Sequence, residues 1–487
     1  MIRKFNDFEQ KYNLFNMKLE DFELWVYIRF ELYFAIGEHF GITNGVGSTP
    51  KTTLKDKLCL LWNTIIKNPY YNIDNYDVLI IPHQRRILDG TKYRCIYTDE
   101  IANHLSFSSI TTEFLFGQIH YKPAKSNNIA YLDYIDVWPA IKYKILKCNN
   151  SEIKKYAQII EGYIKEFFSV ELTPGYIEKL IEKRYYWHKY KKPLLRKLLL
   201  KIKPKVIVEV VGYETNKMIL NEVAHDLNIP CIELQHGVIG SGHIAYNYKI
   251  NKPLKQFPSY LFVYSDYWKR TCSFPIGQDR IIPTGFPYLE EQVNKYPKKK
   301  KKGKSINIII YSSTDSSNAI QRFTNELMDQ LEKNNYKYRI TYKLHPLEYN
   351  YTTDIWDSLK ESKNVNFIDS PTKSLYELCS DADIQVGVKT TAVFEGLSYG
   401  LDTFILDTGA PDIEFYMGDL VKAGFAVYGK NAEDFIAFVK GKVAKKNYGQ
   451  DIEDSFFTKN SLENISRGIS KIISLREKDT YECEKHE

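Results

Sequence analysis

Residues 380–406, SDADIQVGVKTTAVFEGLSYGLDTFIL, combine residue types that bind phosphate. A buried strand is expected over Ile384–Val388, followed by a turn ending in Thr390 and Thr391 and by a helix through Glu395. The first N–H groups of a helix are unpaired, so a strand that runs into a helix start makes an anion site. The two hydroxyls add donors, and the Glu395 carboxylate would accept from ribose hydroxyls. The alternative interpretation is an ordinary strand–helix–strand crossover with a Thr cap.

Polar side chains follow the ends of several other predicted strands. In open α/β sheets ligands bind at the carboxyl ends of the strands, so these residues are candidates for a site. In the first half of the chain they are His83, Arg85, Arg86, Glu214, His236 and Asp266. In the second half they are Ser312, Ser313, Thr314, Lys343 and His345. A basic surface loop at 83–86, and plain strand-end residues at His236 and His345, are the alternatives.

The sequence contains no Cys/His cluster with zinc spacing and no DxD pair in a suitable place. We therefore predict a site without a metal ion, in which His, Lys and helix-end donors neutralise a diphosphate leaving group. No cofactor is expected besides a nucleotide-activated substrate.

Strands alternate with helices on both sides of a lysine-rich segment, which predicts two parallel sheets with right-handed crossovers. The predicted fold class is α/β, with two Rossmann-like parallel-sheet domains facing across a cleft. The first domain covers residues 1–295, lies on the acceptor side and begins with a helical extension. Residues 296–304 are a solvated linker, for which a nucleic-acid patch is the less favoured alternative. Residues 305–487 form the domain that binds the nucleotide sugar.

The composition is that of a soluble globular protein of 487 residues, with 44% hydrophobic and 26% charged residues. A net charge of +7 suits acidic ligands or membrane surfaces and does not argue for nucleic acid. The seven Cys are scattered without a CxxC pair, and neither a signal peptide nor an apolar run of bilayer length is present. We expect a cytoplasmic protein.

The stretch HKYKKPLLRKLLLKIKPK at residues 188–205 is basic and amphipathic. Such a helix could lie on an anionic membrane, which would make the protein peripheral at the inner face. The favoured interpretation is a helix that packs on the core and keeps its Lys/Arg face in solvent.

Four short motifs resemble those of GT-B glycosyltransferases: QHG at 235–237, PTGFP at 283–287, KLHP at 343–346 and KTTAVFEGLSYG at 389–400. The resemblance covers the chain from about residue 75 onward. The HG and HP elements are similar to those of bacterial capsule, sialic-acid and teichoic-acid transferases, which use CMP- or CDP-activated donors. The helix at 391–400 is similar to the donor site of sugar-nucleotide transferases and of UDP-N-acetylglucosamine 2-epimerases. The chain has KTT where the teichoic-acid pattern has Asp beside a Ser pair.

The resemblance implies that His345, Thr390 and Thr391 contact the donor phosphate or nucleotide and that His236 lies near the acceptor. Lys343, Glu395 and the Ser312–Thr314 loop would complete the donor site. His236 is the preferred base. His83 and Asp266 are alternatives for the base, and Arg85, Arg86 and Glu214 would bind the acceptor.

We therefore predict a metal-independent, inverting glycosyltransferase that moves a sugar to an oligosaccharide or lipid-linked surface-glycan acceptor. Polyol-phosphate transfer from a CDP-polyol and sugar-nucleotide epimerisation are alternative reactions on the same fold. A nucleotide- or glycan-binding regulator is the non-enzymatic alternative.

Overall fold

The computed structural model of the chain describes residues 1–41, 53–66, 68–71, 73–84, 86–115, 120–126, 128–146, 150–250, 252–300, 303–349, 354–409, 413–441 and 456–486. Arg85, a predicted acceptor contact, lies outside these residues.

The first domain is built on a seven-stranded parallel sheet with the order β5-β4-β1-β6-β7-β8-β9. Its central strands are mostly apolar and are buried along their whole length, as expected of a parallel sheet covered on both faces. The strands are β1 (Val78–Ile81), β4 (Ser109–Glu113), β5 (Ile129–Tyr131), β6 (Val206–Val210), β7 (Cys231–Leu234), β8 (Tyr260–Val263) and β9 (Ile281–Pro283). A small hairpin adds β2 (Ile87–Asp89) and β3 (Lys92–Arg94).

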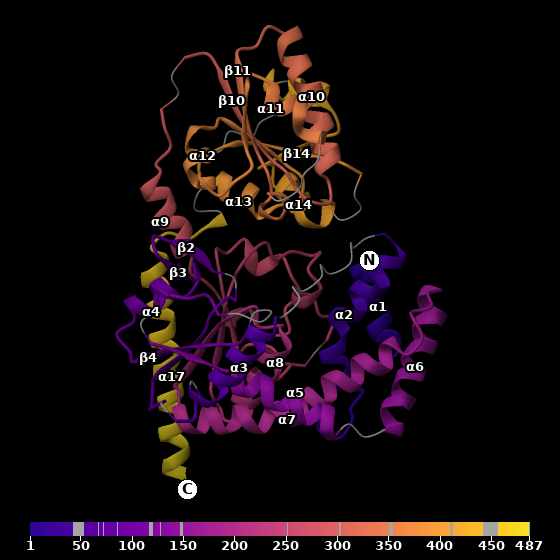
Figure 1. Cartoon of the computed structure of the whole chain (residues 1–487), viewed down its shortest axis with the longest axis vertical. Coiled ribbons are helices and arrows are strands. Elements are labelled where there is room, and N and C mark those ends of the chain that lie inside the picture. Colours follow the sequence, from indigo (N-terminus) through magenta and orange to yellow (C-terminus); the bar gives the residue numbers. More distant parts are fainter. Residues whose placement is uncertain are drawn as a thin grey trace.

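Helices pack around this sheet, and some of them form the base of the molecule in Figure 1. They are α4 (Asp99–His104), α5 (Asp133–Leu146), α6 (Ser151–Phe168), α7 (Tyr176–Ile202), α8 (Thr215–Asp226) and α9 (Pro287–Lys295). The basic stretch at 188–205 begins in α7, whose Leu195, Leu198, Leu199 and Ile202 are buried while Arg196 and Lys197 are exposed. The prediction that this stretch packs on the core is confirmed. In the described residues no helix is long and apolar enough to cross a membrane.

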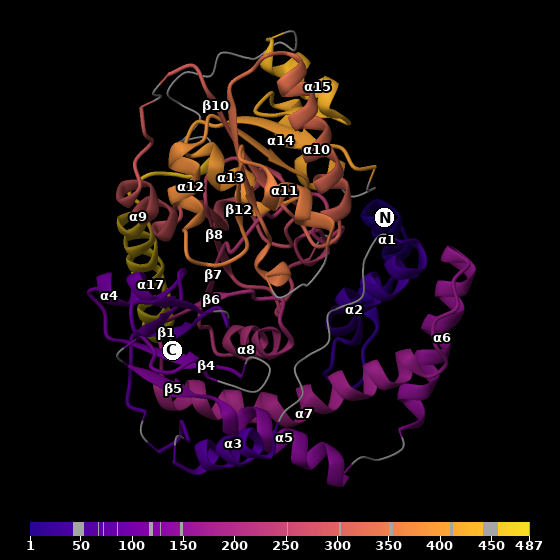
Figure 2. The same cartoon turned by 45° about the horizontal axis from the view of Figure 1, so that its top comes forward.

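The predicted helical extension at the amino end consists of α1 (Ile2–Lys11), α2 (Leu24–His39) and α3 (Leu54–Ile66). Helices α1 and α2 stand beside the sheet together with α6 and the first half of α7 (Figures 1 and 2). They share a core of aromatic side chains, including Phe5, Phe8 and Trp25. Inside it the buried Arg29 guanidinium lies 2.7 Å from the Glu9 carboxylate, which leaves neither charge unpaired.

The second domain is a six-stranded parallel sheet with the order β12-β11-β10-β13-β14-β15. Its strands are β10 (Ile306–Tyr311), β11 (Tyr338–Lys343), β12 (Val365–Ile368), β13 (Ile384–Gly387), β14 (Asp402–Leu406) and β15 (Val427–Gly429). Its helices are α10 (Ser317–Lys333), α11 (Asp357–Glu361), α12 (Leu375–Asp381), α13 (Thr391–Leu397), α14 (Ile413–Lys422) and α15 (Ala432–Val439).

The last helix, α17 (Ser461–His486), returns to the first domain and runs along one side of it in Figure 1. Its Ile465, Ile469, Ile472 and Ile473 pack on one face of β1, β6 and β7. Assigning all of 305–487 to the second domain was therefore wrong, because the chain from about residue 456 belongs to the first. The amphipathic pattern of the helix was visible in the sequence, but the sheet that it covers was not.

Gly285 of the PTGFP motif allows the chain before α17 to pass close to the first domain. It has a φ of 91°, and a Cβ there would lie 2.1 Å from the Thr458 carbonyl and 2.3 Å from the Ser461 hydroxyl oxygen. Only glycine fits such a close approach with this backbone conformation. The carboxylate of Glu290 then accepts hydrogen bonds from the N–H groups of Asn460 and Ser461, which begin α17.

The predicted linker is partly attached to the second domain. The Lys299 N–H donates to the Ser380 carbonyl at 3.0 Å, and its ammonium pairs with Asp381 at 2.8 Å. The segment leads directly from α9 to β10.

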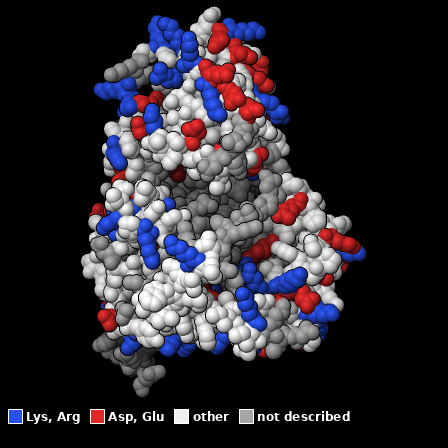
Figure 3. Space-filling view, viewed as in Figure 1, with Lys and Arg blue, Asp and Glu red and all other residues white. Residues whose placement is uncertain are grey.

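Both sheets are parallel and Rossmann-like, and the surface is hollowed between the two domains in Figure 3. The predicted fold class, a GT-B architecture of two such domains, is confirmed.

Candidate functional site

The loops that follow β1, β6 and β7 bring two predicted histidines together. The ring centroids of His83 and His236 are 6.0 Å apart, and Tyr97 lies beside His83 at 5.5 Å. The Tyr97 hydroxyl donates to the main-chain carbonyl of His236 at 2.8 Å, which fixes the turn after β7. Two of the three candidate bases therefore share one place at the carboxyl edge of the first sheet.

The imidazole of His236 lies between a phenol and a carboxylate. Its Nε2 is 3.4 Å from the Tyr213 hydroxyl, and its Nδ1 is 3.9 Å from Oε1 of Glu233. A base that gains a proton becomes an imidazolium, which a carboxylate at this distance stabilises. The side chain of His236 is 14% exposed, so one part of the ring remains accessible.

Two glutamates lie inside the sheet behind His236. Glu209 of β6 and Glu233 of β7 are register partners, and both are buried. Glu209 accepts from Asn221 at 2.8 Å, and Glu233 accepts from the Tyr246 hydroxyl. Burial and the neighbouring carboxylate raise the pKa of Glu209 to about 8, and burial raises the pKa of Glu233 as well. The pair thus retains a proton at neutral pH.

A pocket of about 560 Å³ opens in front of these side chains, between the sheet edge and helices α2 and α7. Its lining includes His83 and His236 together with Gln84, Tyr213, Glu214, Lys217, Phe30, Glu31, Arg184 and Trp187. The predicted acceptor residue Glu214 lies in it, accepting from the Gln84 amide at 2.8 Å and pairing with Lys217 at 3.3 Å. A pocket lined by aromatic rings, carboxylates and cations suits a ligand that carries many hydroxyl groups.

A second hollow of about 460 Å³ shares two lining residues, Phe30 and Glu31, with the first. It continues along α2 toward His39 and is also lined by Phe34 and Tyr176. The two hollows together form a groove that leads from His236 along the helical extension.

In the second domain the turn after β11 is held by a buried glutamate. Glu348 accepts from the N–H of His345 at 2.8 Å and from the Ser312 hydroxyl at 3.1 Å, so it joins two predicted donor loops. The Nδ1 of His345 accepts from the Leu347 N–H at 3.2 Å. This hydrogen bond places the proton of the neutral imidazole on Nε2, which makes that atom a donor.

Thr390 caps α13, its hydroxyl accepting from the Ala392 N–H at 3.3 Å, and Thr391 begins the helix. Lys389, in the same turn, pairs at 2.6 Å with Asp315, which directly follows the Ser312–Thr314 loop. The predicted donor loops after β10, β11 and β13 are therefore neighbours that are tied to one another.

Glu395 lies on α13 where the two domains meet. Burial raises the pKa of Glu395 to about 7, against a hydrogen bond from Tyr376 that lowers it. The neighbouring Phe394 packs on Trp268 of the first domain, with ring centroids 5.0 Å apart. A carboxyl group that titrates near neutrality at such a position is a candidate for a functional role.

The two halves of the site approach each other closely at one point. A Cβ placed on Gly237 would be 3.9 Å from Oγ1 of Thr391. The turn after His236 and the start of α13 thus face each other across the domain boundary.

Other predicted residues are placed differently. Asp266 has a side chain that is 74% exposed and lies 3.8 Å from Lys269, so it is not gathered with the two histidines. The guanidinium of Arg86 is buried within 3.4 Å of Glu113 and 3.6 Å of Asp99, and an acceptor cannot reach it there. Lys343 contacts the Tyr349 hydroxyl, Ser313 donates to Asp315, and Thr314 is exposed.

The residues that hold the predicted site residues in place were not identified from the sequence. Glu209 and Glu233 carried a signal, since each is a lone charge inside an apolar strand, VIVEV or CIEL. Glu348 carried another, the spacing of a capping box from His345. Nothing in the local sequence around Tyr213, Arg184 or Trp187 indicated that they would meet at one pocket.

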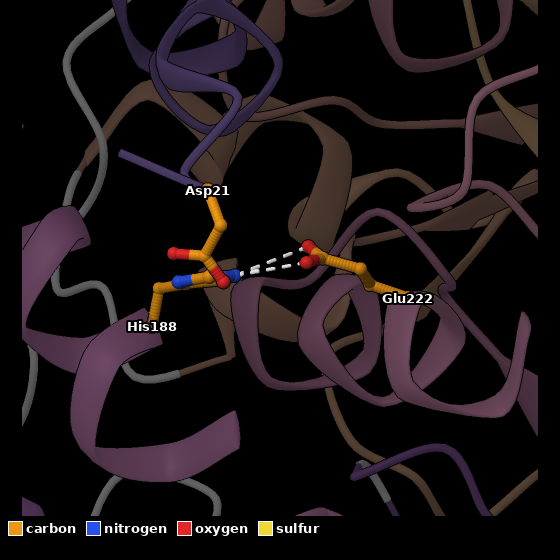
Figure 4. Close-up of side chains that lie close together, drawn as sticks. All are labelled: Asp21, His188 and Glu222. Carbon is orange, nitrogen blue, oxygen red and sulfur yellow. Dashed lines mark hydrogen bonds and ion pairs between the residues drawn. The ribbon is translucent and has the colours of Figure 1, made fainter. Parts of the chain in front are cut away.

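Among the described residues, one group has the composition of a metal site: Asp21, His188 and Glu222 (Figure 4). The ammonium of Lys192 lies 3.0 Å from Asp21 and 2.6 Å from Glu222, so a cation already bridges the carboxylates. Burial opposes ionisation of Glu222, but hydrogen bonds from His188, Lys192 and Tyr27 outweigh it and lower the pKa to about 2. The group is an ion network joining α7 and α8 to the helical extension.

No protein-family model and no curated protein sequence matches the chain. Among solved structures, it is similar to UDP-GlcNAc 2-epimerase of Methanocaldococcus jannaschii in complex with UDP-GlcNAc and UDP, at 15% identity and a TM-score of 0.44 over 81% of this chain and 99% of that one. It is also similar to a putative UDP-N-acetylglucosamine 2-epimerase of Listeria monocytogenes, at 10% identity and 0.49 over 81% and 95%. A variant of the wall teichoic acid polymerase TagF matches at 12% identity and 0.43 over 87% and 98%. Such values assign neither a substrate nor a reaction to this chain.

Proposed function

We propose that the chain is a metal-independent, inverting glycosyltransferase that uses a nucleotide-activated sugar. The observation that carries the proposal is the position of His236. It lines the first-domain pocket, while the adjacent Gly237 faces Thr391 of the second domain. A donor held by the second domain and an acceptor in the pocket would meet at this imidazole.

The donor phosphate would be held by the loops after β10, β11 and β13. Nε2–H of His345 and the hydroxyls of Thr390 and Thr391 supply donors, and Glu348 keeps His345 in place. Glu395 would accept from the ribose hydroxyls. Charge-assisted hydrogen bonds of this kind stabilise the negative charge that develops on the leaving phosphate.

The transfer is a single displacement. An acceptor hydroxyl loses its proton to Nε2 of His236 as its oxygen forms a bond with the anomeric carbon. The bond from that carbon to the phosphate oxygen breaks, and the nucleotide leaves with the electron pair. Attack opposite to the leaving group inverts the anomeric configuration. Glu233 would stabilise the imidazolium.

The acceptor would occupy the groove that begins at His236 and continues along α2. Its two hollows of about 560 and 460 Å³ exceed what one sugar unit needs, which supports an oligosaccharide or a lipid-linked glycan as acceptor. Phe30, shared by both hollows, is stacked on Tyr213 at 5.3 Å and offers a sugar ring an aromatic surface.

A panel of sugar nucleotides, each incubated with and without surface-glycan oligosaccharides, tests the proposal. Nucleotide release that requires acceptor, with sugar incorporated into the product, is the expected result. Isomerisation of the sugar without acceptor would overturn it in favour of an epimerase. Incorporation of polyol phosphate would indicate a phosphotransferase, and binding without turnover a regulator. His236→Ala should strongly reduce the expected activity, whereas His225→Ala, on an exposed part of α8, should not.

A further inference from the structure

Helix α3 exposes the side that a helix normally buries. Leu54, Leu58, Trp62 and Ile65 are 75%, 59%, 63% and 63% exposed, and their spacing places them along one stripe. In contrast, the polar Asn63 is buried at 5%. An apolar stripe that is exposed among the described residues marks a candidate interaction surface.

Helix α5 adds a second exposed apolar stripe. It consists of Trp138, Ile141, Ile145 and Leu146, with exposed fractions from 37% to 73%. Helices α3 and α5 pack against each other, and both lie at the base of the molecule in Figures 1 and 2. The α3–α5 face is the set Leu54, Leu58, Leu61, Trp62, Ile65, Ile66, Trp138, Ile141, Ile145 and Leu146.

Basic side chains border this face. Lys142 lies over the Trp138 ring at 5.7 Å, and Lys144 is exposed in the last turn of α5. The neighbouring end of α7 exposes Arg196, Lys197 and Leu200. The acidic residues of α5 are engaged within the protein: Asp133 is buried, and Asp136 pairs with Lys191 at 2.6 Å. Figure 3 shows mostly uncharged side chains over α3, with Lys and Arg at their border.

Apolar and Trp side chains framed by Lys and Arg fit a membrane interface with anionic headgroups. The apolar stripe enters the boundary of the acyl chains, tryptophans prefer the headgroup level, and cations pair with lipid phosphates. A protein partner would need no excess of positive charge around the apolar residues.

We propose that the α3–α5 face docks this protein on an anionic membrane surface, with both helices lying in the plane of the interface. This contact involves different residues from those of the site, so it stands apart from the proposed reaction. It would place the acceptor groove next to the lipid surface from which a lipid-linked glycan extends.

The test is flotation of the full chain with phosphatidylcholine vesicles, with and without phosphatidylglycerol. The wild type should float with the anionic vesicles and lose binding as salt rises. The triple variant Leu58→Ser, Trp62→Ser, Ile65→Ser should bind at least about tenfold more weakly, since affinity follows the apolar area inserted. All three side chains are exposed, so the fold should be retained. Leu475→Ser, which removes a 45% exposed leucine from α17, is the matched control and should bind as the wild type does.

Two further measurements separate this contact from its alternatives. Lys142→Gln with Lys144→Gln should weaken binding to anionic vesicles only. Turnover of a soluble acceptor should be the same in the triple variant and the wild type, so a failed docking prediction and a failed reaction are distinguishable. Equal flotation of the wild type and the triple variant would overturn the proposal. So would a wild-type dimer, in the absence of lipid, that the triple variant breaks, because a second copy would then cover the face.

Discussion

Glu209 and Glu233 face each other as register partners on β6 and β7, two buried carboxyl groups inside one parallel sheet. Gly212 closes the space around them, since a Cβ there would lie 2.7 Å from one carboxylate and 2.8 Å from the other. Two carboxyl groups that are this close together and shielded from water cannot both be ionised. Their pKa values are raised for this reason. The pair makes the stability of the protein depend on pH.

The pKa of Glu209 is about 8 in the folded protein against 4.5 ordinarily, so the folded state holds a proton that the unfolded chain has lost. The stabilising effect is complete below the ordinary pKa and disappears as pH rises through about 8. The melting temperature of the wild type should therefore fall as pH rises from about 5 to 9, and Glu209→Gln should make this fall smaller. Thermal unfolding followed by circular dichroism measures it. Glu361→Gln, at an exposed position, should leave the wild-type slope, and an unchanged slope in Glu209→Gln would contradict the assignment.

His236 and His345 are expected to fail in different ways when replaced. His236→Ala should leave nucleotide affinity nearly unchanged while turnover falls by roughly 10²–10⁴-fold, as on losing a general base. His345→Ala should weaken nucleotide binding by about 1.5–3 kcal/mol, the contribution of a charged hydrogen bond. Calorimetric titration alongside initial rates measures both. Loss of nucleotide binding in His236→Ala alone would place the donor in the other domain.

His345→Asn separates the two contacts of that imidazole. The Asn side chain can accept from the Leu347 N–H as the Nδ1 atom does, because Asn is a good helix cap. It cannot reproduce the donor on Nε2. If the phosphate contact matters, His345→Asn should bind nucleotide as poorly as His345→Ala while melting at the wild-type temperature. Wild-type affinity in His345→Asn would assign the histidine to the turn alone.

Glu395 is expected to couple nucleotide binding to proton release. Burial raises its pKa to about 7, and a carboxylate that accepts from ribose hydroxyls must be ionised. Affinity should therefore rise with pH through about 7 and then level off, and binding below that pH should release a proton. Titration calorimetry in buffers of different ionisation enthalpy counts the proton. In Glu395→Gln the release should vanish; proton uptake by the wild type would argue against this role.

Activity is expected to survive EDTA, because His345, Thr390 and Thr391 would neutralise the leaving group without a cation. Initial rates before and after chelation measure this. The Asp21, His188 and Glu222 group does not alter the expectation, since Lys192 bridges its carboxylates. Activity that is lost on chelation and restored by Mg²⁺ or Mn²⁺ would contradict the metal-free mechanism.

The sheets could be predicted because their strands are short apolar runs at regular intervals. The strand expected over Ile384–Val388 is β13 (Ile384–Gly387), and His83, His236 and His345 follow the ends of β1, β7 and β11. Position along the chain, however, does not fix where a side chain points. Arg86 follows a strand as His83 does, yet its guanidinium turns into the protein toward Asp99 and Glu113.

Most contacts between residues that are distant in sequence could not be predicted. Tyr213 and Trp187 meet at one pocket only because α7 passes the edge of the sheet. The stripe of α3 was visible as a helical pattern, but a pattern does not tell whether its apolar side faces a core or the outside. That distinction depends on which surfaces the remaining helices cover.

The position of α17 has a consequence for synthesis of the protein on the ribosome. Ile469 and Ile473 belong to one buried cluster with Val78 and Val208 of the sheet. Gly468 lets the helix approach Phe262 so closely that a Cβ would be 2.6 Å from the ring. One face of the first sheet therefore stays open while the whole second domain is made. That apolar face is exposed to aggregation until residues 461–473 have emerged from the ribosome. Chains that end near residue 440 should accordingly be recovered bound to chaperones, with the second domain folded and the first incomplete.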